Sequence, residues 1–192
     1  SEGIRHIDPF SQIRGWGWFG LYAAWFVLVY AIVFLQGGWN ADNATHAIIL
    51  AYFAASLLAF PELKKRLEKT GWRPRTIFVG FSSFSAAVVE TAYMISKPLH
   101  ESLLVTAATP TGLALRNWAA DVLLTLPFYL LLFLLIWRLV NRFDYSPFEY
   151  LFFISLGQAL GDGQAFFALN PGLLAFLPYV MLNYHAMSFV PF

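Results

Sequence analysis

The stretch VLLTLPFYLLLFLLIWRLV, residues 122–140, is apolar along its whole length and carries a single charge, Arg138, near its end. A helix needs about 20 such residues to cross the hydrocarbon core of a bilayer. Further apolar runs of similar length lie on both sides of this stretch. We therefore predict an all-α, single-domain bundle of about six membrane spans, with five as the alternative. The predicted spans are 16–36, 45–60, 76–96, 119–140, 148–169 and 172–190.

The composition also favours a bilayer. Of the 192 residues, 59% are hydrophobic, 19% aromatic and only 12% charged, whereas soluble domains carry about 25% charged residues. A domain this small cannot bury so much apolar surface internally. The net charge of +1 gives no indication of a nucleic-acid partner, and the absence of cysteine excludes disulfides and thiolate metal sites. The first apolar run has no small-residue cleavage site, so we interpret it as a retained span.

Lysines and arginines are distributed unevenly among the predicted connections. If the N-terminus is cytoplasmic, only Lys97 and Arg116 lie on the outer side, as the positive-inside rule requires. We interpret the most basic segment, PELKKRLEKTGWRPR (61–75), as a solvated cytoplasmic loop, with binding to anionic lipids as the alternative. The basic residues expected on the cytoplasmic side are Arg5, Arg14, Lys64, Lys65, Arg66, Lys69, Arg73, Arg75, Arg138 and Arg142.

Four polar side chains interrupt four of the predicted spans at similar depth. Glu90 and Asp162 fall in the outer half of their spans, Asp121 near the outer start of its span, and Asn183 near the midplane. Ionisable groups in hydrocarbon are costly unless they are paired or hydrated, so each is a functional hypothesis. If they converge, a protonated acid and a retained anion could share one site. We predict catalytic roles for the three acids and a ligand-binding role for Asn183.

Each of these residues also has a structural interpretation. Asp121 could begin a helix among the lipid head groups, and Glu90 could be a buried structural acid. Asp162 could hydrogen-bond a neighbouring helix, because Gly157 and Gly161 have the GxxxG spacing that permits close helix packing. The glutamines of the same span are interpreted as groups that hydrogen-bond between helices: Gln158 and Gln164.

Aromatic side chains accompany the acids along the spans. Their faces can stabilise a cationic centre or bind an amine, although contact with lipid is the simpler interpretation of any one of them. The expected ligand-binding aromatics are Tyr93, Trp118, Phe128, Tyr179 and Tyr184, with Phe84 and Phe166 as further members of the set. No cofactor or metal is expected. The four histidines are scattered, and the pair Asp42 and His46 is too small for a metal site.

The order of these polar groups resembles the emopamil-binding protein family, the EXPERA group of sterol isomerases and sigma-2-like receptors. The similar segments are SFSAAVVETAYMIS, NWAADVLLTLPFYLLLFLLIWRLV, SLGQALGDGQAFF and PYVMLNYHAM, and the resemblance covers about residues 40–192. It implies that Glu90 is the first acid, Asp121 the second and Asn183 the amide of the final helix. The family's histidine and tryptophan positions are Ala86 and Ala186 here, which departs from the pattern.

These features predict an integral, multi-pass membrane protein with an acidic intramembrane pocket for a sterol- or isoprenoid-like ligand. Acid–base isomerisation or cyclisation through a carbocation is the chemistry that such a pocket suits. The resemblance implies Glu90 as proton donor and Asp121 as base or stabiliser. One alternative is a proton-linked small transporter, although no inverted repeat is evident. The other is a non-catalytic subunit of a larger membrane complex, and a homo-oligomer is compatible with either.

Overall fold

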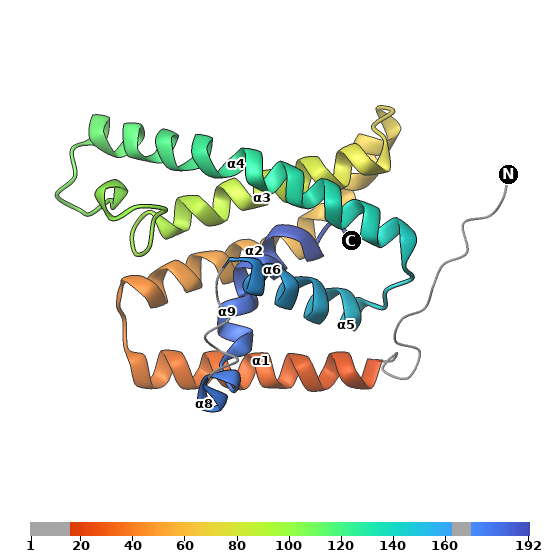
Figure 1. Cartoon of the computed structure of the whole chain (residues 1–192), viewed down its shortest axis with the longest axis horizontal. Helices are drawn as coiled ribbons and strands as arrows, with labels where there is room; N and C mark the ends of the chain where they lie inside the picture. The colour runs from red at the N-terminus through yellow and green to blue at the C-terminus, as the bar shows by residue number, and fades with distance from the viewer. Residues whose placement is uncertain (1–15, 163–169) are drawn as a thin grey trace, which may run out of the picture.

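The computed structural model describes residues 16–162 and 170–192, which form helices joined by turns. Among the described residues, four helices are long and apolar enough to cross a bilayer, and they extend along the long axis of the molecule (Figure 1). They are α1 (Trp16–Gly37), α2 (Ala41–Lys69), α3 (Pro74–Tyr93) and α4 (Thr111–Arg142). The all-α prediction is confirmed for the described residues, and four predicted spans coincide with these helices. Several residues named above lie outside the described part: Arg5, Arg14, Gln164 and Phe166.

The first turns between the helices follow from local sequence. Gly38 and Gly71 adopt positive φ angles of 63° and 84° at the ends of α1 and α2, a conformation that glycine adopts without steric cost. The Asn40 side chain caps α2 by accepting a hydrogen bond from the Asn43 backbone N–H at 2.9 Å. Pro74 begins α3, where its missing N–H has no helical partner to lose.

Two boundaries differ from the prediction. The basic segment 61–75 is not simply a loop, because α2 continues through Pro61 to Lys69. Its lysines, arginine and glutamates favour helix, and Glu62 and Arg66 form an i,i+4 ion pair at 3.3 Å. At the outer side, α4 begins at Thr111 rather than near residue 119, because Pro110 occupies the capping position and ends the preceding connection.

The second half of the chain forms shorter helices. α5 (Pro147–Glu149), η3 (Tyr150–Ile154) and α6 (Ser155–Gly161) run on continuously, with a π-helical turn in the middle. α8 (Pro171–Leu174) precedes α9 (Leu177–Tyr184), which continues into the π-helical η4 (His185–Phe189). Neither run reaches the 18 residues of a candidate span within the described part of the chain. The count of six spans therefore stays a prediction.

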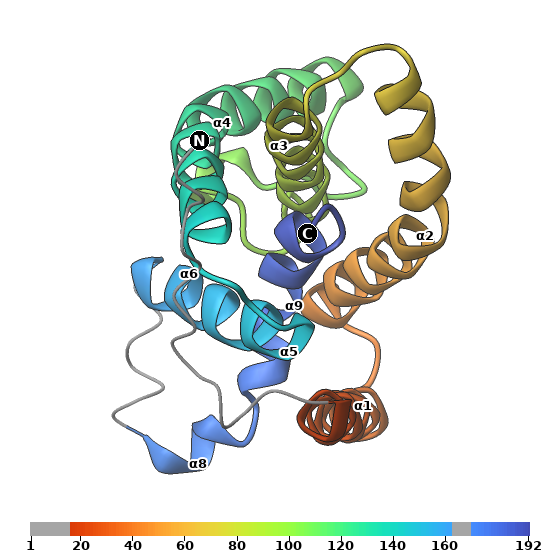
Figure 2. The ribbon, with the colours of Figure 1, turned by 90° about the vertical axis from the view of Figure 1, so that its right-hand side faces the viewer.

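The C-terminal helix occupies the centre of the bundle, and the longer helices surround it (Figure 2). η4 packs on α3 and α2, while α9 packs on α1, α2 and α6. Met181, Leu182, Ala186 and Met187 are almost completely buried. A helix that is apolar on all sides is stable only where protein or lipid covers all sides, and here the protein covers it.

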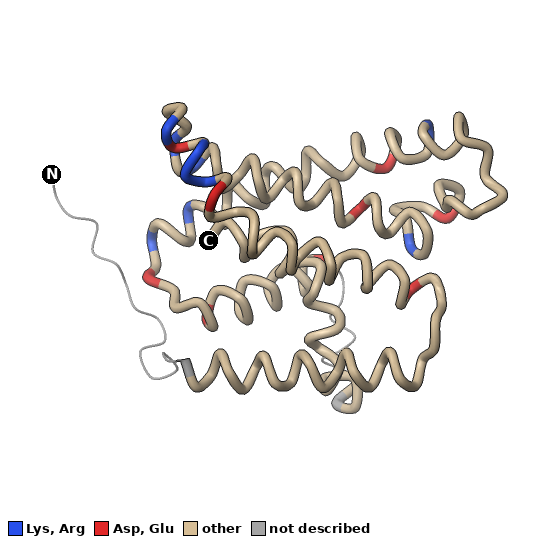
Figure 3. The backbone as a smooth tube through the Cα atoms, turned by 180° about the vertical axis from the view of Figure 1, so that it is seen from behind, with Lys and Arg blue, Asp and Glu red and all other residues tan. Residues whose placement is uncertain are grey.

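Basic residues are distributed unevenly along the long axis (Figure 3). Among the described residues, the basic side chains gather where α2 ends, α3 begins and α4 ends, and the two exceptions are Lys97, after α3, and Arg116, near the start of α4. This arrangement agrees with the positive-inside assignment of the basic end to the cytoplasm. We refer to the end that carries Lys97 as the outer end, and the membrane orientation itself stays a prediction.

Candidate functional site

A cavity with a volume of about 1180 Å³ lies between α3, α4, α6 and α9, and the first turns of α2 border its outer end. α4 and α6 face each other across it. The wall formed by α4 consists of Leu124, Thr125, Phe128, Tyr129, Leu132, Leu135, Ile136 and Leu139. The facing wall consists of Phe153, Ile154, Gly157, Gln158, Gly161 and Asp162.

Glu90 reaches the cavity from the last turn of α3 and is half-buried. The Tyr129 hydroxyl, from the middle of α4, donates a hydrogen bond to Glu90 Oε1 at 2.5 Å. This contact joins two helices that pack closely along their length. The second carboxyl oxygen, Oε2, has no hydrogen bond from the described residues, so it is the atom available to a molecule in the cavity.

Asp162 caps the C-terminal end of α6, and its side chain is exposed on the cavity side. Its Oδ2 accepts a hydrogen bond from the Tyr184 hydroxyl at 2.7 Å. Tyr184 is buried at the end of α9, so α9 holds this carboxylate toward the cavity. Glu90 and Asp162 therefore share one geometry: a carboxyl from one helix held by a tyrosine from another.

Two amide oxygens near the carboxyls lack partners. Gln158 Oε1 and Asn183 Oδ1 are buried and accept no hydrogen bond from any residue in 16–162 or 170–192. The Gln158 Nε2 group makes only long contacts of 3.4 Å, to the carbonyl of Ile154 and the hydroxyl of Ser188. Leaving a buried acceptor unpaired costs about 1–3 kcal/mol. These oxygens are positions where the N–H or O–H of a bound molecule would be stabilised.

The GxxxG pair does not bring helices together. A Cβ placed on Gly157 or Gly161 would meet no atom within 4 Å outside its own helix. Both glycines line the cavity instead. The interpretation of this spacing as a close helix-packing motif is wrong, because no described helix approaches that face of α6. The missing side chains keep the cavity wall open.

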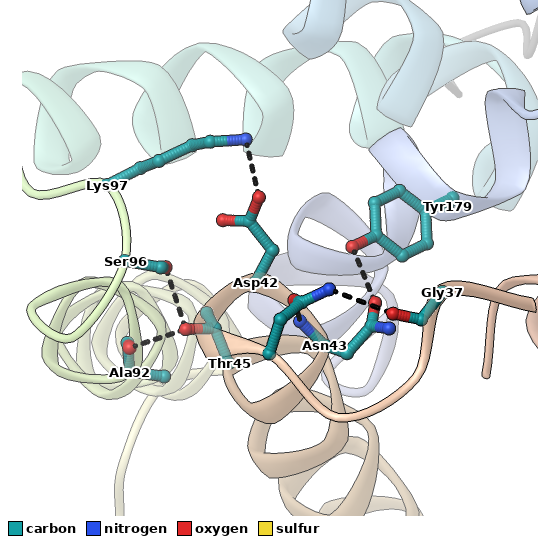
Figure 4. Close-up of polar contacts among 9 residues, drawn as sticks. Gly37, Asp42, Asn43, Thr45, Ala92, Ser96, Lys97 and Tyr179 are labelled. Carbon is teal, nitrogen blue, oxygen red and sulfur yellow. Dashed lines mark hydrogen bonds and ion pairs between the residues drawn. The ribbon is translucent and has the colours of Figure 1, made fainter.

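The outer end of the cavity is polar and lies where the start of α2 packs against the end of α3 (Figure 4). Lys97 Nζ lies 3.2 Å from Asp42 Oδ2, and both side chains are partly exposed. The Thr45 hydroxyl lies 3.1 Å from the Ala92 carbonyl, to which it donates, and 2.7 Å from Ser96 Oγ. These contacts fix the start of α2 against the end of α3, and so they place the ion pair at the cavity entrance.

Sequence reasoning missed two aromatic partners and one histidine. His46 lines the cavity with its ring stacked on Tyr179 at a centroid distance of 3.7 Å, and its Nδ1 lies 2.8 Å from the Tyr30 hydroxyl. The i,i+4 spacing of Asp42 and His46 was visible in the sequence. Tyr30 and Tyr129 gave no signal, because tyrosine is common throughout these apolar helices.

Some predicted site residues lie elsewhere. Asp121 does not line the cavity and is fully buried, and its Oδ1 accepts a hydrogen bond from the Leu99 backbone N–H at 2.9 Å. It lies three turns inside α4, so the helix-start interpretation is wrong. Trp118 also lies outside the cavity and donates to the Thr91 hydroxyl at 2.9 Å. Phe84 is 61% exposed on the outside of α3.

The remaining predicted residues converge on the cavity from four helices. They are Glu90, Tyr93, Phe128, Asp162, Tyr179, Asn183 and Tyr184. Their polar atoms are mostly hydrogen-bond acceptors, and aromatic and aliphatic side chains surround them. Such a wall can bind an apolar molecule and exchange a proton with it.

Within the described ranges, no group of three or more histidine, aspartate or glutamate side chains is arranged to hold a metal ion. No protein-family model, curated protein or solved structure matches the chain.

Proposed function

We propose that this membrane protein binds a lipophilic small molecule in the cavity and contacts its polar part with Glu90 and Asp162. The observation that carries the proposal is the pair of carboxyls described above. They come from different helices, each is hydrogen-bonded by a tyrosine from another helix, and both border one cavity. An ionisable group inside a membrane is costly, so it is a functional-site hypothesis by default.

The surroundings of the carboxyls support a lipophilic ligand. Most side chains along α4 that border the cavity are aliphatic or aromatic. Leu124, Phe128 and Leu135 are each more than half exposed at this edge of α4, where the bilayer would surround the molecule. A ligand dissolved in the bilayer could therefore enter sideways between α4 and α6 without crossing water.

Acid–base isomerisation of an alkene next to the polar part of the ligand is the reaction we propose for this pair. The proton of a neutral Glu90 forms a new C–H bond with one alkene carbon and leaves a carbocation on the other. Asp162 then removes a proton from the neighbouring carbon, and that C–H electron pair forms the shifted double bond. Water returns the proton from Asp162 to Glu90. The rings of Tyr93 and Tyr179 border the same space and would stabilise the cation.

This scheme includes kinship with the emopamil-binding protein family as part of the proposal, with one change of residue. The resemblance gives the second acid as Asp121, whereas we assign that role to Asp162. Asp121 accepts the Leu99 N–H and lies outside the cavity, while Asp162 borders it. A positioning role in the outer connection is therefore the better account of Asp121.

Glu90→Gln tests the proposal. The amide oxygen can still accept from Tyr129, so the fold should persist, but the amide cannot donate an acidic proton. We expect about tenfold less lipid retained by the gently extracted protein in mass spectrometry, because removing one partner of a buried hydrogen bond costs about 1–3 kcal/mol. Glu101→Gln, at an exposed position outside the cavity, is the control. A folded Glu90→Gln protein with an unchanged lipid profile would refute the proposal.

A further inference from the structure

We infer that the ligand of this cavity is an elongated, single-chain amphiphile. Its head group donates hydrogen bonds at the outer end, and its alkyl or isoprenyl chain follows α4 toward the basic end of the molecule. The inference rests on the proposed function, because it concerns the same cavity. It narrows the class of candidate ligands from sterol- or isoprenoid-like molecules to linear ones.

The cavity is long in the direction of α4. Its lining residues on this helix run from Leu124 to Leu139. At a rise of about 1.5 Å per residue, they span roughly 22 Å. The facing wall runs antiparallel from Asp162 back to Phe153, so both walls extend in the same direction. A linear chain can use this whole length.

Polarity changes from one end of the cavity to the other. Glu90, Asp162 and Asn183 lie toward the outer end with the Asp42–Lys97 ion pair. Among the described lining residues, the inner half has no polar side chain on either wall. It is formed by Leu132, Leu135, Ile136 and Leu139 on α4, facing Phe153 and Ile154. An apolar chain gains free energy in this half without leaving any protein polar group unpaired.

The outer half requires a head group that donates. Gln158 is only 6% exposed, lines the cavity and has an unpaired Oε1, and Asn183 Oδ1 is also unpaired. The ionised carboxylate of Asp162 adds a further acceptor. Lys97 is the one cation among the described lining residues, and Asp42 already pairs with it. A hydroxyl or ammonium head satisfies these acceptors, whereas a phosphate or carboxylate head would add like charge.

The alkyl or isoprenyl chain of the ligand can enter the cavity from the side, between α4 and α6. Phe128 is 75% exposed at one edge, and Gly157 and Gly161 present no side chain at the other. A linear chain can enter here sideways, because it needs only a narrow opening and can bend. A rigid fused-ring molecule would need the whole opening at once.

The affinity of the purified protein for alcohols of increasing alkyl-chain length tests the inference. The probes are primary alcohols from octanol to octadecanol. Each further buried methylene should raise the affinity about fourfold, until the chain reaches the inner end of the cavity and the affinity levels off. Leu139→Trp fills that end, so the affinity should level off at a shorter chain while octanol binds as before. Leu131→Trp, 68% exposed on the same helix and outside the cavity, is the matched control.

Further variants keep the test decisive. If Leu139→Trp does not fold, Leu135→Trp at a more exposed lining position takes its place. Primary amines of matched length show whether an ammonium head binds better than a hydroxyl, and either result supports a donating head. Fatty acids that bind as tightly as the alcohols would overturn the donor assignment.

Failure of this inference differs from failure of the proposed function. If Glu90→Gln weakens every alcohol but the tryptophan variants leave the chain-length profile unchanged, the ligand is compact. The elongated ligand is then refuted, and lipophile binding at the carboxyls stands. If Glu90→Gln weakens none of the alcohols, the proposed function is refuted as well.

Discussion

Two polar clusters inside the same apolar bundle differ in whether all of their hydrogen-bonding groups have partners. One is the carboxyl pair of the cavity, Glu90 and Asp162. The other is a closed cluster around His185, which is 1% exposed in η4. The His185 Nδ1 lies 2.7 Å from Ser155 Oγ, and its Nε2 lies 2.6 Å from the Tyr22 hydroxyl. Both ring nitrogens therefore have partners, and the cluster joins α1, α6 and η4.

The cavity carboxyls keep spare hydrogen-bonding capacity. A carboxylate offers about four acceptor sites, yet the tyrosine contact is the one protein hydrogen bond found for each of Glu90 and Asp162 among the described residues. They also line the cavity, and His185 is not among the residues that line it. Burial alone does not distinguish a site from a structural contact. A group with unused hydrogen-bonding capacity that faces a cavity is the one that marks a site.

His185→Ala should produce the largest effect and confine it to stability. The change opens a cavity at a fully buried position and leaves the Tyr22 and Ser155 hydroxyls unpaired, so we expect a loss of about 2–4 kcal/mol in the free energy of unfolding. Thermal or detergent-induced unfolding of the purified protein measures it. His100→Ala, at an exposed position, should cost little. Equal effects of the two changes would contradict a structural role for the His185 cluster.

A matched pair of tyrosine variants compares the clusters directly. Tyr22→Phe leaves His185 Nε2 without its partner in a closed interior, and we expect a cost of about 1–2 kcal/mol. Tyr184→Phe removes the contact to Asp162, whose exposed carboxylate can bind water instead, so the cost should stay below about 1 kcal/mol. Unfolding midpoints measured side by side decide the order. The reverse order would mean that the carboxyl pair, not the histidine, holds the bundle together.

Composition and apolar run length were sufficient to predict the all-α fold and four candidate spans. Helix propensity was underweighted at 61–69, where charged residues extend α2 beyond the apolar run. The central position of α9 and η4 could not be predicted. A helix that faces lipid and a helix that faces protein are both apolar on all sides, so the sequence does not say which one the bundle surrounds.

Only part of the candidate site could be predicted, because an all-apolar helix does not reveal which of its faces meets the protein. Glu90 and Asp162 stood out because an acid in an apolar run has few structural explanations. Asp121 stood out equally, yet it faces the outer connection. The sequence could not separate it from the other two acids, because an all-apolar surface does not encode the rotation of a helix about its axis. His185 was passed over as one of several scattered histidines. Its partners lie 30 and 163 residues away in the chain.

Gly157→Ala gives the smallest expected effect and tests the cavity wall directly. A GxxxG packing contact would make any added methyl destabilising, whereas here the methyl would meet nothing within 4 Å. Alanine also favours helix over glycine by up to about 1 kcal/mol, so stability should stay the same or rise slightly. Gly157→Leu should fold as well, because its side chain extends into the cavity, but it should occupy ligand space and reduce lipid retention. If Gly157→Ala lowered the unfolding midpoint clearly, a helix would have to approach this face of α6. The side opening of the cavity between α4 and α6 would then be closed.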